Sequence, residues 1–527
     1  MSIHKLFLVT TASLIMGTSL SLANTKQPTY TIDLKSYTSL KTDVGAVATV
    51  MDQDISAMDA QMQGMLGPQL FALIDPAKPW HGAVWYEAMD QPPVVAFSLP
   101  ISDFEAFGVA LQSSMLGMMG ARSMDMGDAV LLYGSQPGVV VSEEIVEAVS
   151  AYGKALNTVP EETIEISMVM TEALRALVLQ SITGPKESFM SVLDDSALET
   201  TGLPAGSMRS MMEAYFSVYE TVIKDLESLK YGMSVEQNDW SMFLDITPMS
   251  DSPTSEFLSS QDVQLSDLTS QLDWNADVAM LVGMASLPES WESILGELMK
   301  MAMPIYGLEA AAAHEWMDAI TLSLPIKGAY SMSFDGGLSY AGFYEIIDSD
   351  AAEVYEKWIK LTKDMVGSAQ ASYSYYSEIT VEKAVRSVGG HSVDLVTLTI
   401  NPESAAMQLP EQREVMEAMF PGGKVAYELC LIDDRIYMAS EGALDATIQQ
   451  VATPAPMQIS EATRIAGSMN IISMMRGFGS TMEASGLSLE GIDATGMNIL
   501  FSAEVSDSLK LYTKIPLKLF EVFSKME

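Results

Sequence analysis

The stretch from Gly328 to Ile347 reads GAYSMSFDGGLSYAGFYEII and decides the fold class of this chain. In its first half, apolar Tyr330, Met332 and Phe334 alternate with polar residues, which is the period of a strand with one face in water. Asp335-Gly336-Gly337 follows, and a second apolar run comes after it. Glycine adopts the backbone dihedral angles that tight hairpin turns need. The stretch therefore predicts an antiparallel hairpin.

Other pairs of apolar runs are joined by short turns of the same chemistry. They are Ala83–Met89 with Val94–Leu99, Ile379–Ser387 with Ser392–Ile400, and Lys424–Ile432 with Arg435–Ala439. Between the hairpins, apolar residues recur at helical spacing, for example from Trp291 to Met299. Strands that follow one another as hairpins predict antiparallel meanders, not a parallel sheet. We therefore expect an α+β fold.

The order of these pieces occurs twice, from Tyr37 to about Leu258 and from about Leu272 to Phe523. Two predicted strands match, Asp43–Val47 with Asp277–Leu281, and so do two hairpins that lead into a helix, Val94–Phe104 with Leu338–Val354. Two strand pairs followed by a Ser-Glu helix start also match, Leu131–Val146 with Leu429–Leu444. The last match is between two strand-helix units, Ile164–Leu179 and Ile465–Phe478. The helix starts fall at Ser142 and Ser440. We expect two duplicated antiparallel sheet-plus-helix halves related by a pseudo-twofold axis, residues 24–260 and 272–527, with residues 261–271 as their linker.

The first 23 residues have the composition of a secretory signal peptide. Lys5 supplies a positive start, Leu6 to Leu20 is mostly apolar, and Ser21-Leu22-Ala23 is a small-x-small cleavage site. Export to a periplasmic or extracellular space follows, with a mature start near Asn24. The alternative is an uncleaved anchor, although the run is short for a span, and the rest of the chain predicts no integral membrane segment.

The chain is strongly acidic. Its 69 acidic residues against 28 Lys and Arg give a formal net charge of −41, and the acids are dispersed along the sequence. Such a surface repels nucleic acid and anionic lipid head groups. We expect no nucleic-acid partner. A solvated acidic surface is the simplest interpretation of the charge pattern.

The chain has one cysteine, Cys430, within the predicted strand Val425–Ile432. A single cysteine excludes an intramolecular disulfide bond. No positive charge adjoins it in the sequence, so it is predicted to be a small buried hydrophobe and not a reactive thiolate.

Forty methionines distinguish the composition. Because methionine is flexible and polarizable, a face lined by it can adapt to different ligands. The helical stretches Ile55–Leu66 and Met208–Tyr219 are therefore candidates to line an apolar groove at the seam between the halves. The predicted ligand-binding residues are Met58, Met62, Met65, Met208, Met212 and Phe216. The alternative is that these methionines fill ordinary core.

Motifs for catalysis or cofactor binding are not found. The sequence has no nucleophile elbow, phosphate loop or dinucleotide fingerprint, so we expect no cofactor. His81 and His391 are predicted to lie at exposed turns or strand starts. His314 and Asp318 are spaced to share one face of a helix, but the second histidine of a zinc-protease helix is missing. Short acidic pairs such as Asp348 and Asp350 fit helix caps better than calcium loops.

The signal peptide, the repeated hairpin-and-helix order and the phrase Arg435–Ser440 before an acidic helix resemble large exported bacterial proteins of uncharacterised families. That resemblance implies export and an α+β fold, and it assigns no functional residue. Two functions remain open. One is a non-enzymatic binding or scaffold protein of the cell envelope that holds an apolar small molecule or a protein partner in the seam. The other is a metal- or carboxylate-dependent hydrolase, since catalytic residues need converge only in space.

Overall fold

The structure is a computed structural model of the whole chain. It describes residues 27–86, 92–136, 139–156, 159–192, 207–303, 312–334, 337–367, 376–402, 413, 420, 422–449, 453–477, 489 and 491–526. The predicted signal peptide and the turn residues Asp335 and Gly336 lie outside this part, as do residues 87–89 of one predicted strand.

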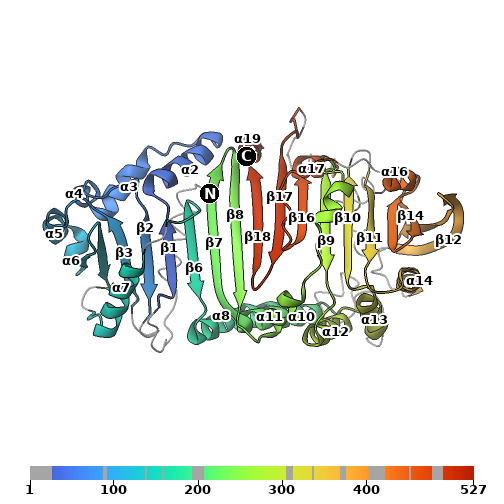
Figure 1. Cartoon of the computed structure of the whole chain (residues 1–527), viewed down its shortest axis with the longest axis horizontal. Helices are drawn as coiled ribbons and strands as arrows, with labels where there is room; N and C mark the ends of the chain where they lie inside the picture. Colours follow the sequence, from blue (N-terminus) through green and yellow to red (C-terminus); the bar gives the residue numbers. More distant parts are fainter. Residues whose placement is uncertain are drawn as a thin grey trace.

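The described residues form one antiparallel sheet of eighteen strands (Figure 1). In chain order the strands are β1 (Tyr30–Leu34), β2 (Trp80–Trp85), β3 (Val94–Pro100), β4 (Arg122–Asp125), β5 (Ala129–Gly134), β6 (Ile164–Val169), β7 (Leu226–Glu236), β8 (Asp239–Pro248), β9 (Val278–Met284), β10 (Ile326–Ser333), β11 (Ser339–Ile346), β12 (Tyr376–Val388), β13 (His391–Ile400), β14 (Lys424–Ile432), β15 (Arg435–Ser440), β16 (Thr463–Asn470), β17 (Asn498–Val505) and β18 (Leu509–Pro516).

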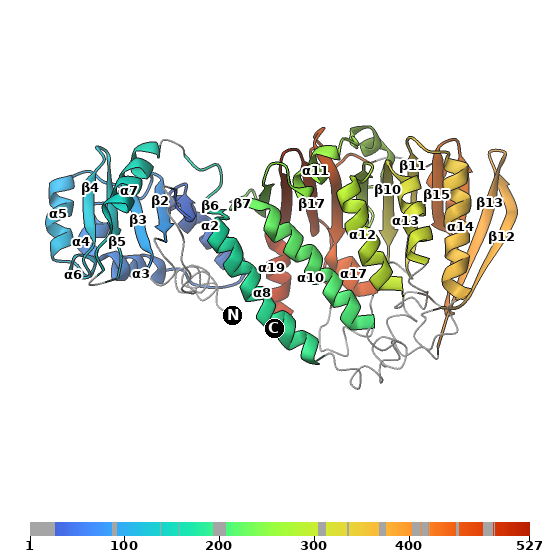
Figure 2. The same cartoon turned by 90° about the horizontal axis from the view of Figure 1, so that it is seen from below.

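Helices connect these strands and pack at both ends of them (Figures 1 and 2). They are α2 (Tyr37–Val50), α3 (Ala57–Leu66), α4 (Pro68–Phe71), α5 (Phe104–Gln112), α6 (Met115–Met118), α7 (Glu143–Ala155), α8 (Glu172–Val192), α10 (Ser207–Asp225), α11 (Pro253–Ser260), the 3-10 helix η2 (Ser266–Gln271), α12 (Glu289–Ala302), α13 (Ala312–Ser323), α14 (Ala351–Gly367), α16 (Leu444–Ile448), α17 (Ile471–Gly477) and α19 (Leu517–Met526). No helix of the described part is long and apolar enough to cross a membrane.

The strands pair in the same order on either side of the centre. We call β1–β8 the first arm and β9–β18 the second arm. From its outer end inward, the first arm runs β4, β5, β3, β2, β1, β6, β7, β8. From β14 inward, the second arm runs β14, β15, β11, β10, β9, β16, β17, β18. The arms join where β8 pairs with β18, and the hairpin β12–β13 extends the second arm beyond β14.

One continuous row of paired residues crosses the sheet, and we call it the central row. It comprises Ser123, Leu132, Phe97, Gly82, Ile32, Ile166, Tyr231, Leu244, Leu511, Ala503, Ile465, Val282, Gly328, Tyr344, Ile436 and Leu431. Leu244 and Leu511 form its middle pair. Directly paired residues of antiparallel strands point to the same face. The central row therefore marks one face of the sheet.

The two glycines of the central row hold equivalent places. Counted outward from Leu244 through the first arm, Gly82 is the fourth residue of the central row. Counted outward from Leu511 through the second arm, Gly328 is also the fourth. Each is paired with an aromatic residue on the outer side, Phe97 or Tyr344. A Cβ atom at Gly82 would lie 3.2 Å from the Phe97 ring, and one at Gly328 would lie 2.7 Å from the Tyr344 ring. At Gly328 the ring occupies the space of a side chain, so glycine is needed there, whereas at Gly82 a side chain would fit tightly.

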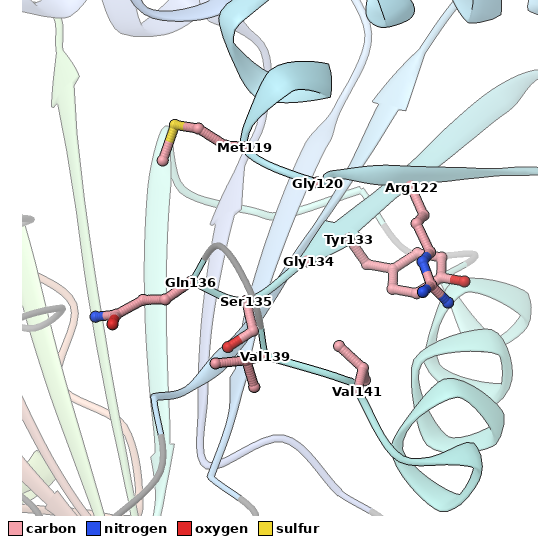
Figure 3. Close-up of a pocket in the computed structure, with 9 residues that line it drawn as sticks. All are labelled: Met119, Gly120, Arg122, Tyr133, Gly134, Ser135, Gln136, Val139 and Val141. Carbon is pink, nitrogen blue, oxygen red and sulfur yellow. The ribbon is translucent and has the colours of Figure 1, made fainter.

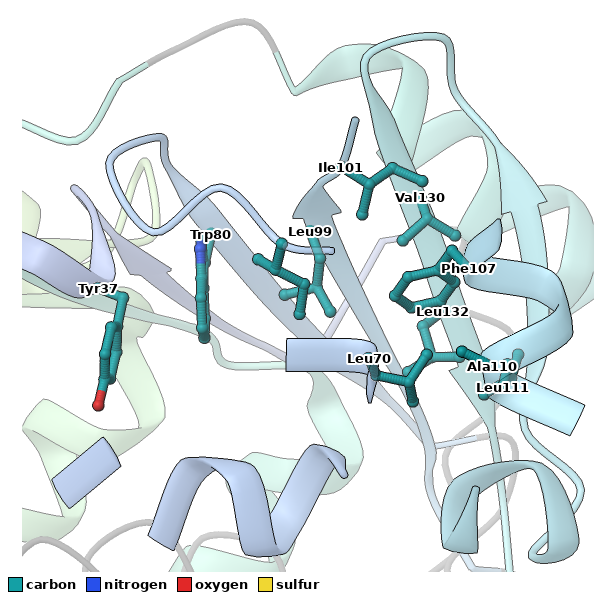
Figure 4. Packing of buried hydrophobic residues seen from close by; sticks show 11 residues of the cluster. Tyr37, Leu70, Trp80, Leu99, Ile101, Phe107, Ala110, Leu111, Val130 and Leu132 are labelled. Atoms are coloured by element: carbon teal, nitrogen blue, oxygen red, sulfur yellow. The ribbon is translucent and has the colours of Figure 1, made fainter. Parts of the chain in front are cut away.

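Helices cover both faces of the outer parts of the sheet. On the central-row face, Tyr37 of α2 stacks on Trp80, and α4 and α5 pack over Leu99 and Leu132 (Figure 4). In the second arm, α14 packs over Ile346 and Ile436. The opposite face of the first arm is covered by α7. In the second arm, Leu265, Leu268 and neighbouring residues cover this face by packing against buried residues of β9, β10 and β11. Each arm thus has cores on both sides of its outer strands.

Several sequence predictions are wrong in detail. Asp43–Val47 lies inside α2 and is not a strand, because a five-residue apolar run fits a helix as well. Val139–Val141 form no strand either. Ser142 does cap α7, but Ser440 ends β15, where its hydroxyl accepts from the Tyr340 amide, and α16 begins only at Leu444. The expected linker, residues 261–271, is packed, since Leu265 and Leu268 are fully buried.

Candidate functional site

An apolar strip follows the middle of the central row. We define the central strip as Ile32, Ile166, Tyr231, Leu244, Leu511, Ile465 and Val282. Leu511 and Ile465 are exposed, at 37% and 36%, and the others are half-buried. These residues belong to none of the core clusters of buried residues in the described part of the chain. The strip crosses eight strands, because the buried Ala503 of β17 lies between Leu511 and Ile465. At about 4.8 Å between strands, it extends over roughly 34 Å.

Helices pack at both ends of the central strands and leave the strip between them. At one end of β8, Ile246 packs against a core that includes Leu174 of α8. At the other end, the Trp240 ring lies 5.3 Å from the Phe520 ring of α19, measured between centroids. Leu244 lies between these two contacts and on the same face. The strip is therefore bordered by helices along both edges.

A charged row crosses the opposite face of the same strands. The row Lys230, Asp245, Lys510 and Glu504 alternates in charge across β7, β8, β18 and β17. Lys230 Nζ lies 2.7 Å from Glu165 Oε2, and Lys510 Nζ lies 3.8 Å from Asp245 Oδ2. Burial alone would raise the pKa of Glu165, but Lys230 and two backbone amides lower it overall. The central strip has no such charges, but the row next to the charged one holds the aromatic pair Phe243 and Tyr512.

The predicted residues of α3 belong to the first arm. Met58 and Met62 are half-buried and pack against the core cluster that contains Tyr37, Leu70 and Phe107. Met65 is 61% exposed. Two of the three methionines thus contribute to ordinary packing around α4 and α5.

The predicted residues of α10 lie elsewhere. Met212 and Phe216 are half-buried, and Lys186 Nζ lies 5.6 Å from the centre of the Phe216 ring. The side chain of Met208 lies outside the described part of the structure. In the described part, α10 contacts α8, α11 and α12, whereas α3 contacts α4. Figure 1 places α3 and α10 at opposite ends of the strands, so the structure does not bring the two sets together.

A small pocket lies at the outer end of the first arm (Figure 3). Its volume is about 50 Å³, and its lining residues are Met119, Gly120, Arg122, Tyr133, Gly134, Ser135, Gln136, Val139 and Val141. Sites for whole small molecules usually enclose several hundred Å³. This pocket is the size of one small side chain, and it was not among the predicted sites.

The histidines singled out in the sequence lie in different elements of the described structure. The prediction that His81 is exposed is wrong: it is 7% exposed in β2, and its Nδ1 lies 2.8 Å from Asp33 Oδ1. His314 and Asp318 do share a face of α13, with 3.9 Å between Nδ1 and Oδ1, and both are exposed. Within the described ranges, no three His, Cys, Asp or Glu residues are grouped as metal ligands would be.

Cys430 is fully buried in β14. Burial raises the pKa of its thiol, and nearby Arg386 only partly opposes that effect. The thiol is therefore protonated at neutral pH and packs as an apolar side chain.

The central strip was missed at the sequence level. Its signal is the recurrence of Met242, Leu244 and Ile246 at every second position, although Phe243 between them interrupts the apolar and polar alternation. That pattern cannot say whether helices will cover the apolar face, because the helices come from distant parts of the chain.

Comparisons with known proteins give no family. No protein-family model and no curated protein matches the chain. Among solved structures, the one titled "Structure of crystal form III of TP0453" is matched over 42% of this chain and 77% of its own, with 5% sequence identity and a TM-score of 0.20. A similarity at that level carries no argument about fold or function.

Proposed function

We propose that this chain is an exported, non-enzymatic binding or scaffold protein of the cell envelope, which holds an apolar ligand or protein partner on the central strip. The observation that carries the proposal is the half-exposed apolar row through Leu244 and Leu511, where the two arms meet. Export rests on the composition of residues 1–23, and the periplasm or the extracellular space is the proposed location.

We also infer that the arms are duplicated copies related by a pseudo-twofold axis between Leu244 and Leu511. The shared strand order and the equivalent places of Gly82 and Gly328 support this inference. So do the helix starts after β3 and β11, where Asp103 and Asp350 accept hydrogen bonds from backbone amides of α5 and α14. A duplicated binding surface would place its site at the seam.

The energetics favour occupation of the strip. Removing an apolar side chain from water stabilises a complex by about 25 cal/mol per Å² of area. Leu511 and Ile465 still expose more than a third of their surface, in the middle of a row of apolar neighbours. Isolated exposed apolar residues are common, but a contiguous row is typical of interaction surfaces.

The decisive experiment compares two adjacent residues on opposite faces of β18. Leu511 and Tyr512 are 37% and 38% exposed, but only Leu511 belongs to the central strip. An environment-sensitive apolar dye would be titrated against the parent protein, Leu511→Asn and Tyr512→Asn. We expect Leu511→Asn to weaken dye binding about tenfold, since about 1.4 kcal/mol of burial would be lost, and Tyr512→Asn to change it little.

Thermal melts of the three proteins provide the control, because Leu511 already reaches water and its replacement should leave the fold intact. Equal weakening by both variants, or no dye binding to the parent protein, would reject the central strip as the binding site. Native mass spectrometry of the parent would then identify any co-purified apolar ligand.

A further inference from the structure

The two outer ends of the sheet differ. In the first arm, β4 pairs with β5 alone among the described strands, so its other side is a free edge. In the second arm, β14 pairs with β15 on one side and with β13 on the other. The hairpin β12–β13 therefore covers the second arm at the place where the first arm ends.

The register of the sheet identifies equivalent residues at these two ends. Leu132 and Ile436 hold matching positions in the central row. One residue further along β5 and β15, Tyr133 pairs with Arg122, and Tyr437 pairs with Cys430. Arg122 is thus the counterpart of Cys430.

Continuing along β5 and β15, Ser135 is the counterpart of Ala439. Cys430 and Ala439 are fully buried in the second arm, where α16 packs near them and β13 pairs beside Cys430. They form one core with Leu444 of α16 and with Val388 and Val393 of the hairpin, and Val393 pairs directly with Cys430.

In the first arm the counterparts Arg122, Tyr133 and Ser135 line the small pocket instead (Figure 3). The pocket thus lies beside the edge of β4 that corresponds to the edge of β14 at which the hairpin adds in the second arm.

We propose that the pocket and the free edge of β4 bind an extended segment of another protein, which adds to β4 as β13 adds to β14. The inference depends on the register of the sheet and not on the central strip. The occupant would place a small side chain, comparable to Val393, in the pocket of about 50 Å³. Strand addition of this kind gains affinity from main-chain hydrogen bonds and specificity from such a pocket.

The backbone of β4 has groups free for this pairing. The Met126 amide donates to the Ala129 carbonyl across the turn, which fixes the hydrogen-bonding alternation of the β4–β5 pair. Because the direction alternates from one residue to the next, Met124 and Arg122 also direct their backbone amides and carbonyls toward β5. Ser123 and Asp125 direct theirs toward the free edge, where a partner strand would meet them.

The side chains around this edge favour an apolar, non-acidic partner. Met115 and Met118 belong to α6, and Met119 follows it. Their exposed fractions are 64%, 76% and 46%. Flexible methionines suit contact with varied apolar side chains. The net charge of −41 disfavours an acidic segment.

A second copy of this chain is a poorer candidate for the occupant. The other free edge of the sheet, β12, carries exposed charges such as Glu378 and Glu382, and its register shifts between Glu382 and Arg386. Charges and bulges of this kind keep edge strands from pairing.

A random 12-residue phage-displayed peptide library, selected on the mature full-length protein, provides the probe. Selected peptides would be measured against the parent, Ser123→Pro, Ser123→Ala and Met119→Trp. Ser123→Pro removes an outward amide without taking a hydrogen bond from the β4–β5 pair, and Met119→Trp places bulk at the pocket. We expect peptides with alternating apolar residues, bound equally by the parent and Ser123→Ala and at least tenfold more weakly by the other two variants.

Circular dichroism and thermal melts would verify that each variant is folded. If Ser123→Pro is unfolded, Met119→Trp still tests the proposal. Failure to enrich any peptide, or equal binding by all variants, would overturn the proposal. Self-association of the parent that Ser123→Pro abolishes would also overturn it, in favour of a second copy as the occupant. A loss of dye binding by Leu511→Asn with intact peptide binding would show that the two sites are independent.

Discussion

Leu244 and Leu511 lie directly opposite each other in β8 and β18, and they are the only point at which the central row passes from one arm to the other. The row reaches a glycine after the same number of strands on both sides. If the arms are duplicated copies, as we propose, this pair lies on their pseudo-twofold axis. This geometry makes the seam the natural position for a site shared by both arms.

The first prediction concerns processing. Mass spectrometry of the protein isolated from its native source should find a mature N-terminus at or near Asn24, because Ser21-Leu22-Ala23 fits a signal-peptidase site. A full-length product that begins at Met1 and remains in the cytoplasm would contradict export.

The second prediction tests the glycine of the second arm. Gly328→Ala should destabilise the protein by about 1–3 kcal/mol, since the new Cβ would lie 2.7 Å from the Tyr344 ring and 2.9 Å from the Phe343 carbonyl oxygen. Gly296→Ala in α12 is the matched control, because no atom lies within 4 Å of its Cβ position. The control should be neutral or stabilise by up to about 1 kcal/mol. Urea unfolding measures both, and equal effects would count against the close ring contact.

A third prediction compares the helix caps of the two arms. Asp103→Ala and Asp350→Ala should each cost about 1 kcal/mol, since each removes a carboxylate that accepts a backbone amide at 2.9 Å. Replacement by Asn at either position should restore most of that stability. If only one alanine variant is destabilised in chemical denaturation, the two helix starts are not equivalent.

The fourth prediction concerns acid stability. Arg386 binds Glu428 through two hydrogen bonds, of 2.6 and 2.7 Å, and thereby lowers the pKa of that carboxyl. A carboxyl with a lowered pKa in the folded state stabilises the protein above its unfolded pKa, and this stability is lost as the pH falls through the folded value. The ordinary pKa of a glutamate carboxyl is 4.5, so the loss of stability should begin near that pH.

Glu428→Gln should therefore be less stable than the parent at pH 7, by about 2–4 kcal/mol, since it leaves Arg386 without its buried partner. The difference should shrink below pH 4.5 as the parent loses the same interaction. Denaturant titrations between pH 7 and pH 3 measure this convergence. A constant difference over that range would show that Glu428 acts through packing and not through its charge.

Local sequence determined the elements of this fold that depend on short-range chemistry. The turn residues around Gly389 and Asp433 each lie between apolar runs of strand character, and both predicted hairpins form. The helical spacing from Trp291 to Met299 likewise predicts α12. These signals suffice because turn geometry and amphipathic periodicity depend on neighbouring residues.

These local signals do not predict contacts between residues that are distant in the sequence. Asp33 and His81 form a pair across 48 positions, and Trp274 packs in the second arm through a segment that resembles a polar linker. The run Asp43–Val47 became a helix because α2 packs Tyr37 and Leu40 into the core, and five residues carry too little periodicity to show this.

The sequence by itself determined the acidic surface, the antiparallel hairpins and the methionine-rich helix faces, because composition and local pattern fix them. Only the tertiary structure decided that α3 and α10 lie apart, that β8 joins β18, and that β4 is left as a free edge. Strand pairing between remote segments depends on which apolar faces find partners in space, and a one-dimensional pattern does not contain that information.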